Sequence, residues 1–508
     1  VVVCGPRPLR GRRGCPDQAS AAGGRHHCVL VLGAGLVWVS SAPRMEIFNL
    51  AFTISAVLTA LATLSARAGS ESSAPTTAAF RGFQLTFLVI YYVSMTADWL
   101  QGPYVYALYS SYGFSKHDIA VLFVGGFGAS MVFGTFIGAA ADRLGRKRFC
   151  QLYCVLYIAS CVTKHAKDYN MLMVGRVLGG VATSLLFSSF DSWLVCEHNA
   201  RGYESKLLSG TFSWMYFGNS LCAILAGMMA EAAADRVPLT ATSSPPWYYG
   251  GYCSPFDLSA MFLVVALALI TVFWNENYGE RSARQLEASR AGYLESASAS
   301  LHAPIKMMMD DPSIVLCGTV VSLFEGSMYI FVFNWTPSIS AGMSTTPPFG
   351  WIFACFMVAC MGGSSLFALL SQSLSCEKIL LYTFLVAAAA LSVPIFATST
   401  AYVLTAFLVF EACVGIYWPA MGTVKSKVVP EAARATIYNI FRIPLNAVVL
   451  GVLLNQMDVS MAFFWCTLML AVSFGCMLLL GARSQKQPSS TIEDGEQALI
   501  NHAEDDGK

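Results

Sequence analysis

Long apolar runs separated by short polar stretches dominate this chain. An α-helix rises about 1.5 Å per residue, so roughly 20 apolar residues cross the hydrocarbon core of a membrane. Such runs predict transmembrane helices at 46–66, 84–110, 118–141, 149–166, 169–191, 207–234, 256–275, 313–336, 349–372, 379–398, 402–424, 434–455 and 459–481. The pattern predicts an all-α polytopic membrane protein with one N-terminal hydrophobic helix followed by twelve more.

The longest polar segment between these runs follows the sixth of the twelve helices and divides them six and six. The expected parts are a leader at 1–44, an extra hydrophobic helix at 45–67, an N-terminal half at 83–275, a central loop at 276–312, a C-terminal half at 313–481 and an acidic tail at 482–508. The leader is Arg-rich and precedes the first Met, so we interpret it as an upstream translated segment or a targeting peptide.

Lys and Arg are shared unequally between the two sets of loops. Most lie in the loops near 142–148, 192–206, 276–312 and 425–434. The alternate loops contain only Lys116, Lys164, Lys167 and Arg236. Because cytoplasmic loops carry an excess of Lys and Arg, we expect the central loop and the C-terminal tail in the cytoplasm.

Composition narrows the class of function. The chain is 56% hydrophobic and 12% charged, well below the roughly 25% charged residues of soluble domains. A net charge of +1 gives no basis for nucleic-acid binding, and the 16 Cys are scattered mostly singly within apolar runs, which predicts neither a metal site nor a cofactor. None of the seven His lies centrally in a predicted helix, which argues against an intramembrane enzyme. No ATP-binding Gly-rich loop is present, so we expect transport to be driven by ion gradients or exchange.

The loop "GAAADRLGRKR" at 138–148 has a specific spacing of glycines and charges. Gly145 permits a tight turn between two helices, and Asp142 beside the basic residues can form a charge-assisted latch. The expected latch residues are Gly138, Asp142, Arg143, Gly145, Arg146 and Lys147. This spacing resembles the loop signature of the major facilitator superfamily, and "GRVLGG" at 175–180 resembles a second motif of that superfamily.

Further segments resemble the molybdate-anion transporter branch of the superfamily. They include "ADWLQGPYVYALY", "LLFSSFDSWLVCEH", "WNENYG", "LFEGSMYIFVFNWTP", "GIYWPAMGTVKSKVVPE" and "NIFRIPLN". The resemblance implies a major-facilitator-type bundle that moves a small oxyanion, expected to be molybdate, across the plasma membrane by alternating access. Two alternatives stay open: a carrier of another small solute, such as a sugar or an amphipathic compound, and a non-transporting sensor or scaffold with the same fold.

Charged residues within the predicted helices mark a candidate pathway, because a charge at membrane depth is costly and usually functional. Estimated depths along the helices predict two ion pairs, Asp98 with Arg176 and Glu411 with Arg442. These pairs leave Glu325 without a basic partner, so we expect it to favour its protonated form and to couple transport to protons. Residues at equivalent positions also suggest that the two halves are related by an internal repeat. Asp98 in the first of the twelve helices corresponds to Glu325 in the seventh.

The repeat extends to two further helix pairs. Arg176 and Gly180 correspond to Glu411 and Gly415 in the fourth and tenth helices, and Asn219 corresponds to Asn446 in the fifth and eleventh. The expected pathway residues are Asp98, Gln101, Tyr104, Arg176, Asn219, Glu325, Tyr329, Glu411, Tyr417, Asn439, Arg442 and Asn446. Interhelical hydrogen bonds and helix packing remain alternative roles for the amides and aromatics among them.

Overall fold

The computed structural model describes most of the chain. The described residues are 27–32, 35–40, 46–68, 77–243, 246–278, 305–430, 434–455 and 457–484. The chain divides into two compact units, Val1–Leu50 and Ala51–Lys508. In the first unit, β1 (His27–Leu32) pairs antiparallel with β2 (Gly35–Ser40), a hairpin that the sequence did not predict. The rest of the expected leader lies outside the described residues.

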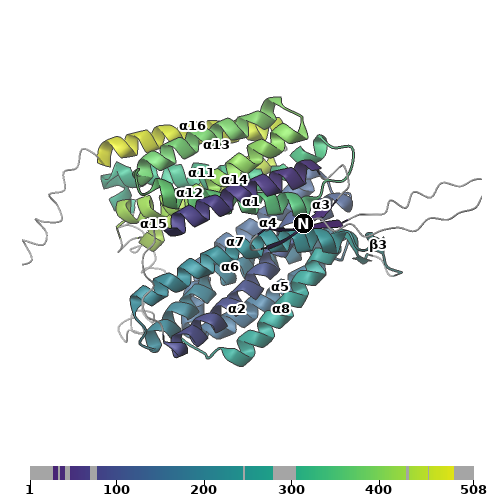
Figure 1. The fold of residues 1–508 in the computed structure, drawn as a ribbon, viewed down its shortest axis with the longest axis horizontal. Coiled ribbons are helices and arrows are strands. Elements are labelled where there is room, and N and C mark those ends of the chain that lie inside the picture. Colours follow the sequence, from purple (N-terminus) through teal and green to yellow (C-terminus); the bar gives the residue numbers. More distant parts are fainter. Residues whose placement is uncertain are drawn as a thin grey trace, which may run out of the picture. The chain divides into compact units, whose positions relative to one another are not determined.

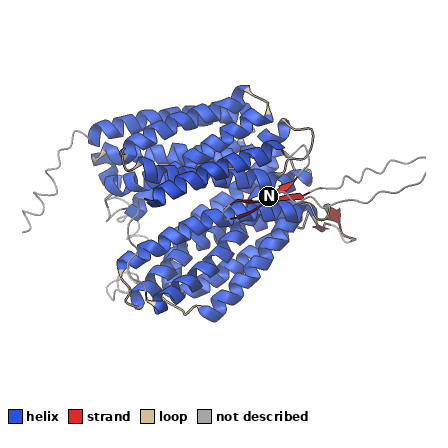
Figure 2. Cartoon of the chain, in the orientation of Figure 1, coloured by secondary structure: helices blue, strands red, loops and turns tan. Residues whose placement is uncertain are grey.

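The second unit is built almost entirely of helices (Figure 2). The N half comprises α2 (Ala78–Gln101), η1 (Gly102–Tyr104), α3 (Val105–Ser111), α4 (Lys116–Leu144), α5 (Arg146–Thr163), α6 (Tyr169–Ala200), α7 (Ser205–Ala234) and α8 (Ser254–Phe273). The C half comprises α11 (Pro312–Ala341), α12 (Phe349–Leu370), α13 (Cys376–Phe396), α14 (Thr400–Val428), α15 (Arg434–Leu454) and α16 (Val459–Ser484).

Short polar residues begin several of these helices. Ser115 and Asp118 form a reciprocal capping box at the start of α4, and the Asp168 carboxylate accepts the Met171 N–H at 2.8 Å at the start of α6. The predicted helix at 84–110 is interrupted at η1, because Pro103 lacks a backbone N–H to continue the α-helical ladder. The sequence therefore predicted the run but not its break.

Among the described residues, eleven helices are long and apolar enough to cross a membrane. The two predicted spans outside this set are helical as well. α5 is short and begins with three basic residues, and the apolar part of α15 is confined to the shorter stretch Ile440–Leu454. The twelve-helix fold with one additional N-terminal helix is thus present. α5 packs against α6 and α8, and α15 packs against α11.

The helices pack in the same pattern in both halves. α2 contacts α7 and α8 while α6 contacts α4 and α5, and in the C half α11 contacts α15 and α16 while α14 contacts α12 and α13. Figure 1 shows the helices of each half lying together. The matching pairs make α2 equivalent to α11, α4 to α12, α6 to α14 and α7 to α15. This is the parallel repeat that the sequence suggested.

Two glycines in equivalent helices confirm the repeat at the level of packing. A Cβ at Gly180 on α6 would collide with the Gly126 carbonyl on α4, and a Cβ at Gly415 on α14 would collide with the Cys360 carbonyl on α12. Both helix pairs therefore approach backbone to backbone, which only glycine permits.

The two ends of the bundle are distinguished by their loops. We call the end that carries β3 (Thr240–Ala241) and β4 (Tyr248–Tyr249) the hairpin side, and the end that carries the turn at Gly145 the glycine-turn side. The hairpin loop rests on the α5–α6 connection, since the Tyr248 N–H donates to the His165 carbonyl at 2.8 Å. His165 Nε2 also lies 2.9 Å from Asp257 Oδ1 at the start of α8.

The extra helix is α1 (Glu46–Ala68), whose residues from Ala51 onward belong to the second unit. It is bound to α12 by side-chain hydrogen bonds: Thr59 Oγ1 donates to the Val358 carbonyl at 3.0 Å, and the Thr63 and Ser365 hydroxyls lie 2.8 Å apart. The remaining face carries exposed apolar side chains such as Leu58 and Leu61, as expected of a helix in contact with lipid.

Candidate functional site

Asp98 in α2 is half-buried and bonded to a tyrosine. The Tyr157 hydroxyl of α5 donates to Asp98 Oδ1 at 2.6 Å, a short charge-assisted hydrogen bond. The expected ion pair with Arg176 is wrong. Depth along the helix placed the two residues at one level, but Asp98 points toward α5 whereas Arg176 faces α4.

Arg176 is held by groups of α4 rather than by an acid. Its Nε donates to the Leu122 carbonyl at 3.1 Å, and its guanidinium lies over the Phe123 ring at 4.7 Å. Gly126 makes room for it, since a Cβ there would lie 2.7 Å from Arg176 Nη2. A carbonyl and a cation–π contact therefore compensate part of this charge inside the N half.

Glu325 in α11 lies in a cluster of polar groups in the C half. The Tyr417 hydroxyl of α14 donates to Glu325 Oε1 at 3.1 Å, and the Tyr417 ring stacks on Phe324 at 3.9 Å. The charges of Lys425 and Arg442 both act on the Glu325 carboxylate. Among the described residues neither of them forms a salt bridge with Glu325, so the Tyr417 hydroxyl is its contact partner and the two positive charges reach it only at longer range. Lys425 lies eight residues after Tyr417, so helical periodicity places both on one face of α14.

Glu411 and Arg442 do not form the expected ion pair. Glu411 is buried, with 7% of its surface exposed, and lies near Cys360 where α14 crosses α12. Arg442 is exposed on α15 and its charge acts on Glu325 instead. The sequence estimate of depth was again insufficient, because the rotation of a helix decides which neighbour a side chain meets.

Arg442 lies on a face of α15 that looks toward the N half. Asn446 is one turn further along this face, and its Nδ2 lies 2.9 Å from Met131 Sδ of α4. Nearby, the Tyr329 ring packs on Phe127 at 5.0 Å, also across the two halves. These contacts place Arg442, Asn446 and Tyr329 along the seam between the halves.

The N half contributes a second wall of this seam. Trp99 Nε1 donates to Asn219 Oδ1 at 2.8 Å, and the Trp99 ring packs on Phe353 of α12 at 5.8 Å. Asn219 is thus oriented by a partner whose ring reaches the other half. The seam is therefore lined by the Trp99 indole of α2 and the Asn219 amide of α7. The paired rings of Phe127 from α4 and Tyr329 from α11 line it as well.

Two expected pathway residues lie elsewhere, and a third is not described. Gln101 is buried between α2 and α8, where its Nε2 donates to Ser259 Oγ at 3.1 Å, and this fits interhelical bonding rather than a pathway. Tyr104 lies toward the hairpin side and donates to Glu231 at 2.6 Å. The side chain of Asn439 lies outside the described residues. Glu231 and Lys425 are further functional candidates that were not among the expected pathway residues.

The glycine-turn side shows how the expected latch motif is fastened. Gly145 has a φ of +112°, and Glu276 from the end of α8 accepts the Lys147 N–H at 2.8 Å and the Arg148 N–H at 3.3 Å. Arg146 Nη1 donates to the Ser192 carbonyl at 3.0 Å. The surroundings of the other expected members, Gly138, Asp142 and Arg143, are not described.

Within the part of the chain that the structure describes, no three His, Cys, Asp or Glu side chains come together as a metal site. The chemistry of the seam is that of hydrogen-bond donors, the exposed Arg442 guanidinium, the Glu325 carboxyl group and aromatic walls. Among these, the guanidinium is the cationic donor group that suits an anion.

Comparison with known proteins agrees with this arrangement. Residues 47–416 match a family described as sugar transporters, 12 TM. The molybdate-anion transporter of Xenopus tropicalis is 34% identical over 426 residues, which cover 81% of this chain and 88% of that protein. The molybdate-anion transporter of Takifugu rubripes is 34% identical over 415 residues, covering 77% and 83%. A solved mutant of the peptide transporter POT in complex with sulfate shares the fold, with a TM-score of 0.61, 13% identity, and coverage of 79% of this chain and 94% of its own.

Proposed function

Because this chain belongs to the molybdate-anion transporter family of twelve-span membrane transporters, we propose that it carries molybdate across a membrane by alternating access. The substrate is proposed from the relatives' names together with the donor chemistry of the seam. The seam then serves as the path, opening to one side of the membrane at a time.

The observation that carries the proposal is the position of Arg442. Its guanidinium is exposed on the face of α15 that meets the N half, one turn from Asn446. A guanidinium presents a planar fork of donors that matches two oxygens of a tetrahedral oxyanion. Arg176 is a weaker candidate, because the Leu122 carbonyl and the Phe123 ring already engage it.

Proton coupling is the second part of the proposal. Glu325 and the substrate anion compete for the same positive charge, since Arg442 acts on the Glu325 carboxylate. When Glu325 takes a proton, the charge of Arg442 attracts the anion without a competing carboxylate, and when the proton leaves, the negative carboxylate weakens that attraction. The Tyr417 hydroxyl, 3.1 Å from Glu325 Oε1, stabilises the charged form.

Orientation and location follow from the distribution of basic residues. We place the hairpin side outside the cell and the glycine-turn side in the cytoplasm, with the central segment 276–312 and the tail 482–508 cytoplasmic as well. The plasma membrane is the proposed location, and lipid surrounds the bundle.

Uptake of labelled molybdate into proteoliposomes tests the proposal. Arg442→Gln should reduce uptake at least tenfold, and Arg442→Lys should restore little of it, because an ammonium lacks the planar fork. Arg483→Gln is the matched control, since this exposed arginine ends α16 away from the seam. Normal uptake by Arg442→Gln at equal protein content would overturn the assignment of the binding residue.

Competition identifies the substrate class. Unlabelled molybdate and tungstate should compete with labelled molybdate, sulfate less so, and glucose should leave uptake unchanged. Competition by glucose alone would favour a neutral solute, in line with the sugar-transporter description of the matched family. Binding without any flux would favour a sensor or scaffold.

A further inference from the structure

A carboxylate joins the two halves at the hairpin side. Glu231, near the end of α7, accepts the Tyr104 hydroxyl at 2.6 Å from its own half. The same Oε2 atom accepts the Gly350 N–H at 2.8 Å from the first turn of α12 in the other half. The first amides of a helix lack intrahelical acceptors, and an anion at this end is favoured by the helix dipole. Glu231 thus supplies both a charge and an acceptor to α12.

The backbones themselves touch beside this contact. A Cβ at Gly227 would lie 2.6 Å from the Gly350 carbonyl oxygen and 3.0 Å from the Ala354 nitrogen. The aromatic rings of Tyr104 and Tyr252 pack against Phe349, with centroids 6.0 and 6.2 Å away. The α7–α12 crossing is therefore closely packed, which strengthens the charge-assisted hydrogen bonds within it.

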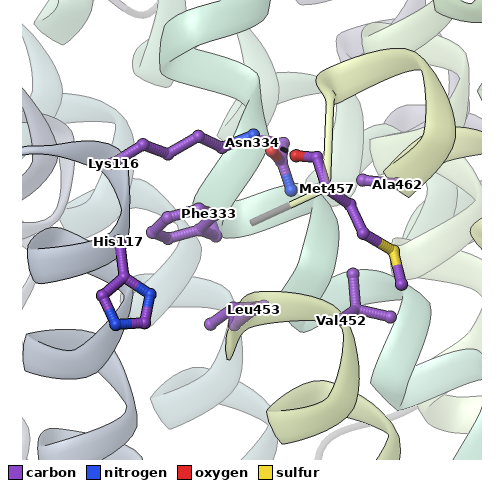
Figure 3. Close-up of a pocket in the computed structure, with 8 residues that line it drawn as sticks. All are labelled: Lys116, His117, Phe333, Asn334, Val452, Leu453, Met457 and Ala462. Atoms are coloured by element: carbon purple, nitrogen blue, oxygen red, sulfur yellow. Dashed lines mark hydrogen bonds between the residues drawn. The ribbon is translucent and has the colours of Figure 1, made fainter. Parts of the chain in front are cut away.

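A second charged contact joins the halves at the other helix pair. Lys116, the first residue of α4, donates from Nζ to the Met457 carbonyl at 2.7 Å, and the charge of Asp458 attracts it. Figure 3 shows the Lys116 side chain reaching toward Met457 above a pocket between the halves. The pocket has room for about one water, and the buried polar atoms Asn334 Oδ1 and His117 Nδ1 have no partner within it.

The two contacts occupy equivalent places in the repeat. Each joins the start of α4 or α12 to the end of α7 or α15, and these helices correspond in the packing pattern of the two halves. Their polarity is reversed: a cation on α4 meets a carbonyl beyond the end of α15, whereas an anion on α7 meets an N–H at the start of α12. The Glu231 charge faces the N-terminal end of α12, which favours an anion, and the Lys116 charge meets a carbonyl of the α15–α16 connection next to Asp458.

We propose that Glu231 and Lys116 are the gate residues of the hairpin side, acting as two charge-to-backbone latches that hold the transporter closed there. The proposal rests on the proposed function only in treating this closure as one step of a transport cycle. Opening the hairpin side separates both pairs together, because the halves move as bodies. Loss of either latch therefore shifts the population toward the form that is open on this side.

Hydrogen exchange measured by mass spectrometry on the full-length protein, in detergent and without substrate, tests the gate. The two reporter segments are 346–356, which holds the Gly350 N–H, and 457–464, which holds Met457. The variants are Glu231→Ala, the isosteric Glu231→Gln and Lys116→Met. Glu377→Ala is the control, because that carboxylate pairs with Lys427 at 3.9 Å on the glycine-turn side.

If these two residues form one gate, each variant should change the rate of hydrogen exchange in both segments. Glu231→Ala should speed amide exchange about tenfold in 346–356, which it contacts, and also in 457–464. Lys116→Met should speed exchange in 457–464, which it contacts, and also in 346–356. A tenfold change is consistent with the loss of one charge-assisted bond. Glu231→Gln should show a smaller effect of the same pattern, and the control should leave both segments unchanged. Faster exchange only in the segment that contacts the altered residue, or in neither, would overturn the gate. No substrate is present, so this result is independent of whether molybdate is carried.

Discussion

Replacing Glu276 by Ala should release the turn between α4 and α5. The Glu276 carboxylate sits at the N-terminus of α5, where it accepts the N–H groups of Lys147 and Arg148 at 2.8 and 3.3 Å. Its interaction with the Arg148 side chain, at 3.7 Å, adds little because 68% of that side chain is exposed. A helix cap is worth about 1 kcal/mol, and the dipole and the second amide bond raise the total to about 2 kcal/mol.

The assay is thermal unfolding of the purified protein in detergent. A loss of about 2 kcal/mol in an N half of this size should lower the melting temperature by about 5 °C. Glu276→Gln keeps an acceptor without the charge and should fall between Ala and wild type. A melting temperature for Glu276→Ala no lower than that of the Glu377→Ala control would refute the view that this carboxylate fastens the turn.

Three further predictions concern the seam, the hairpin side and the repeat. Glu325→Gln should keep molybdate exchange but abolish uptake driven by a pH gradient; accumulation equal to wild type would move the coupling group elsewhere. Burial lowers the pKa of His165, but its hydrogen bond to Asp257 and the charge of that carboxylate outweigh burial, so the net pKa is raised. The ion pair therefore stabilises the fold below about pH 6.5 and is lost as pH rises through the raised pKa, so the melting temperature of wild type should fall from about pH 6 to about pH 8 more than that of His165→Gln. Gly180→Ala should destabilise the fold by about 2 kcal/mol, because its Cβ would collide with the Gly126 carbonyl, and an unchanged melting temperature would contradict this.

The sequence was sufficient to predict the features that depend only on the spacing of residues along the chain. Apolar runs located the helices, and the glycine spacing at Gly180 and Gly415 identified equivalent helices, which the structure joins to their neighbours backbone to backbone. Gly145 was read correctly as a turn glycine, and its φ of +112° shows why. These features depend on local geometry and helical period, so the chain itself carries the information.

The partners of the buried charges could not be obtained in the same way. Depth along a helix is fixed by residue number, whereas the direction of a side chain depends on how the helix is rotated in the bundle. Asp98 and Arg176 share a level but face α5 and α4, and Arg442 faces the neighbourhood of Glu325 rather than Glu411. The acceptor role of Glu231 could not be predicted from the sequence, because it depends on Gly350, more than a hundred residues away.

The two halves share a pattern of packing but not of charge. In the N half the only described partner of Asp98 is the neutral Tyr157 hydroxyl, and Arg176 is engaged by a carbonyl and a ring. In the C half the equivalent acid, Glu325, has two positive charges acting on it. An incoming anion changes the electrostatic balance of Glu325 far more than that of Asp98, because it competes for the charge of Arg442. This asymmetry supports the proposal that proton and anion are coupled within the C half, with the N half supplying the wall and the opposing surface of the gate.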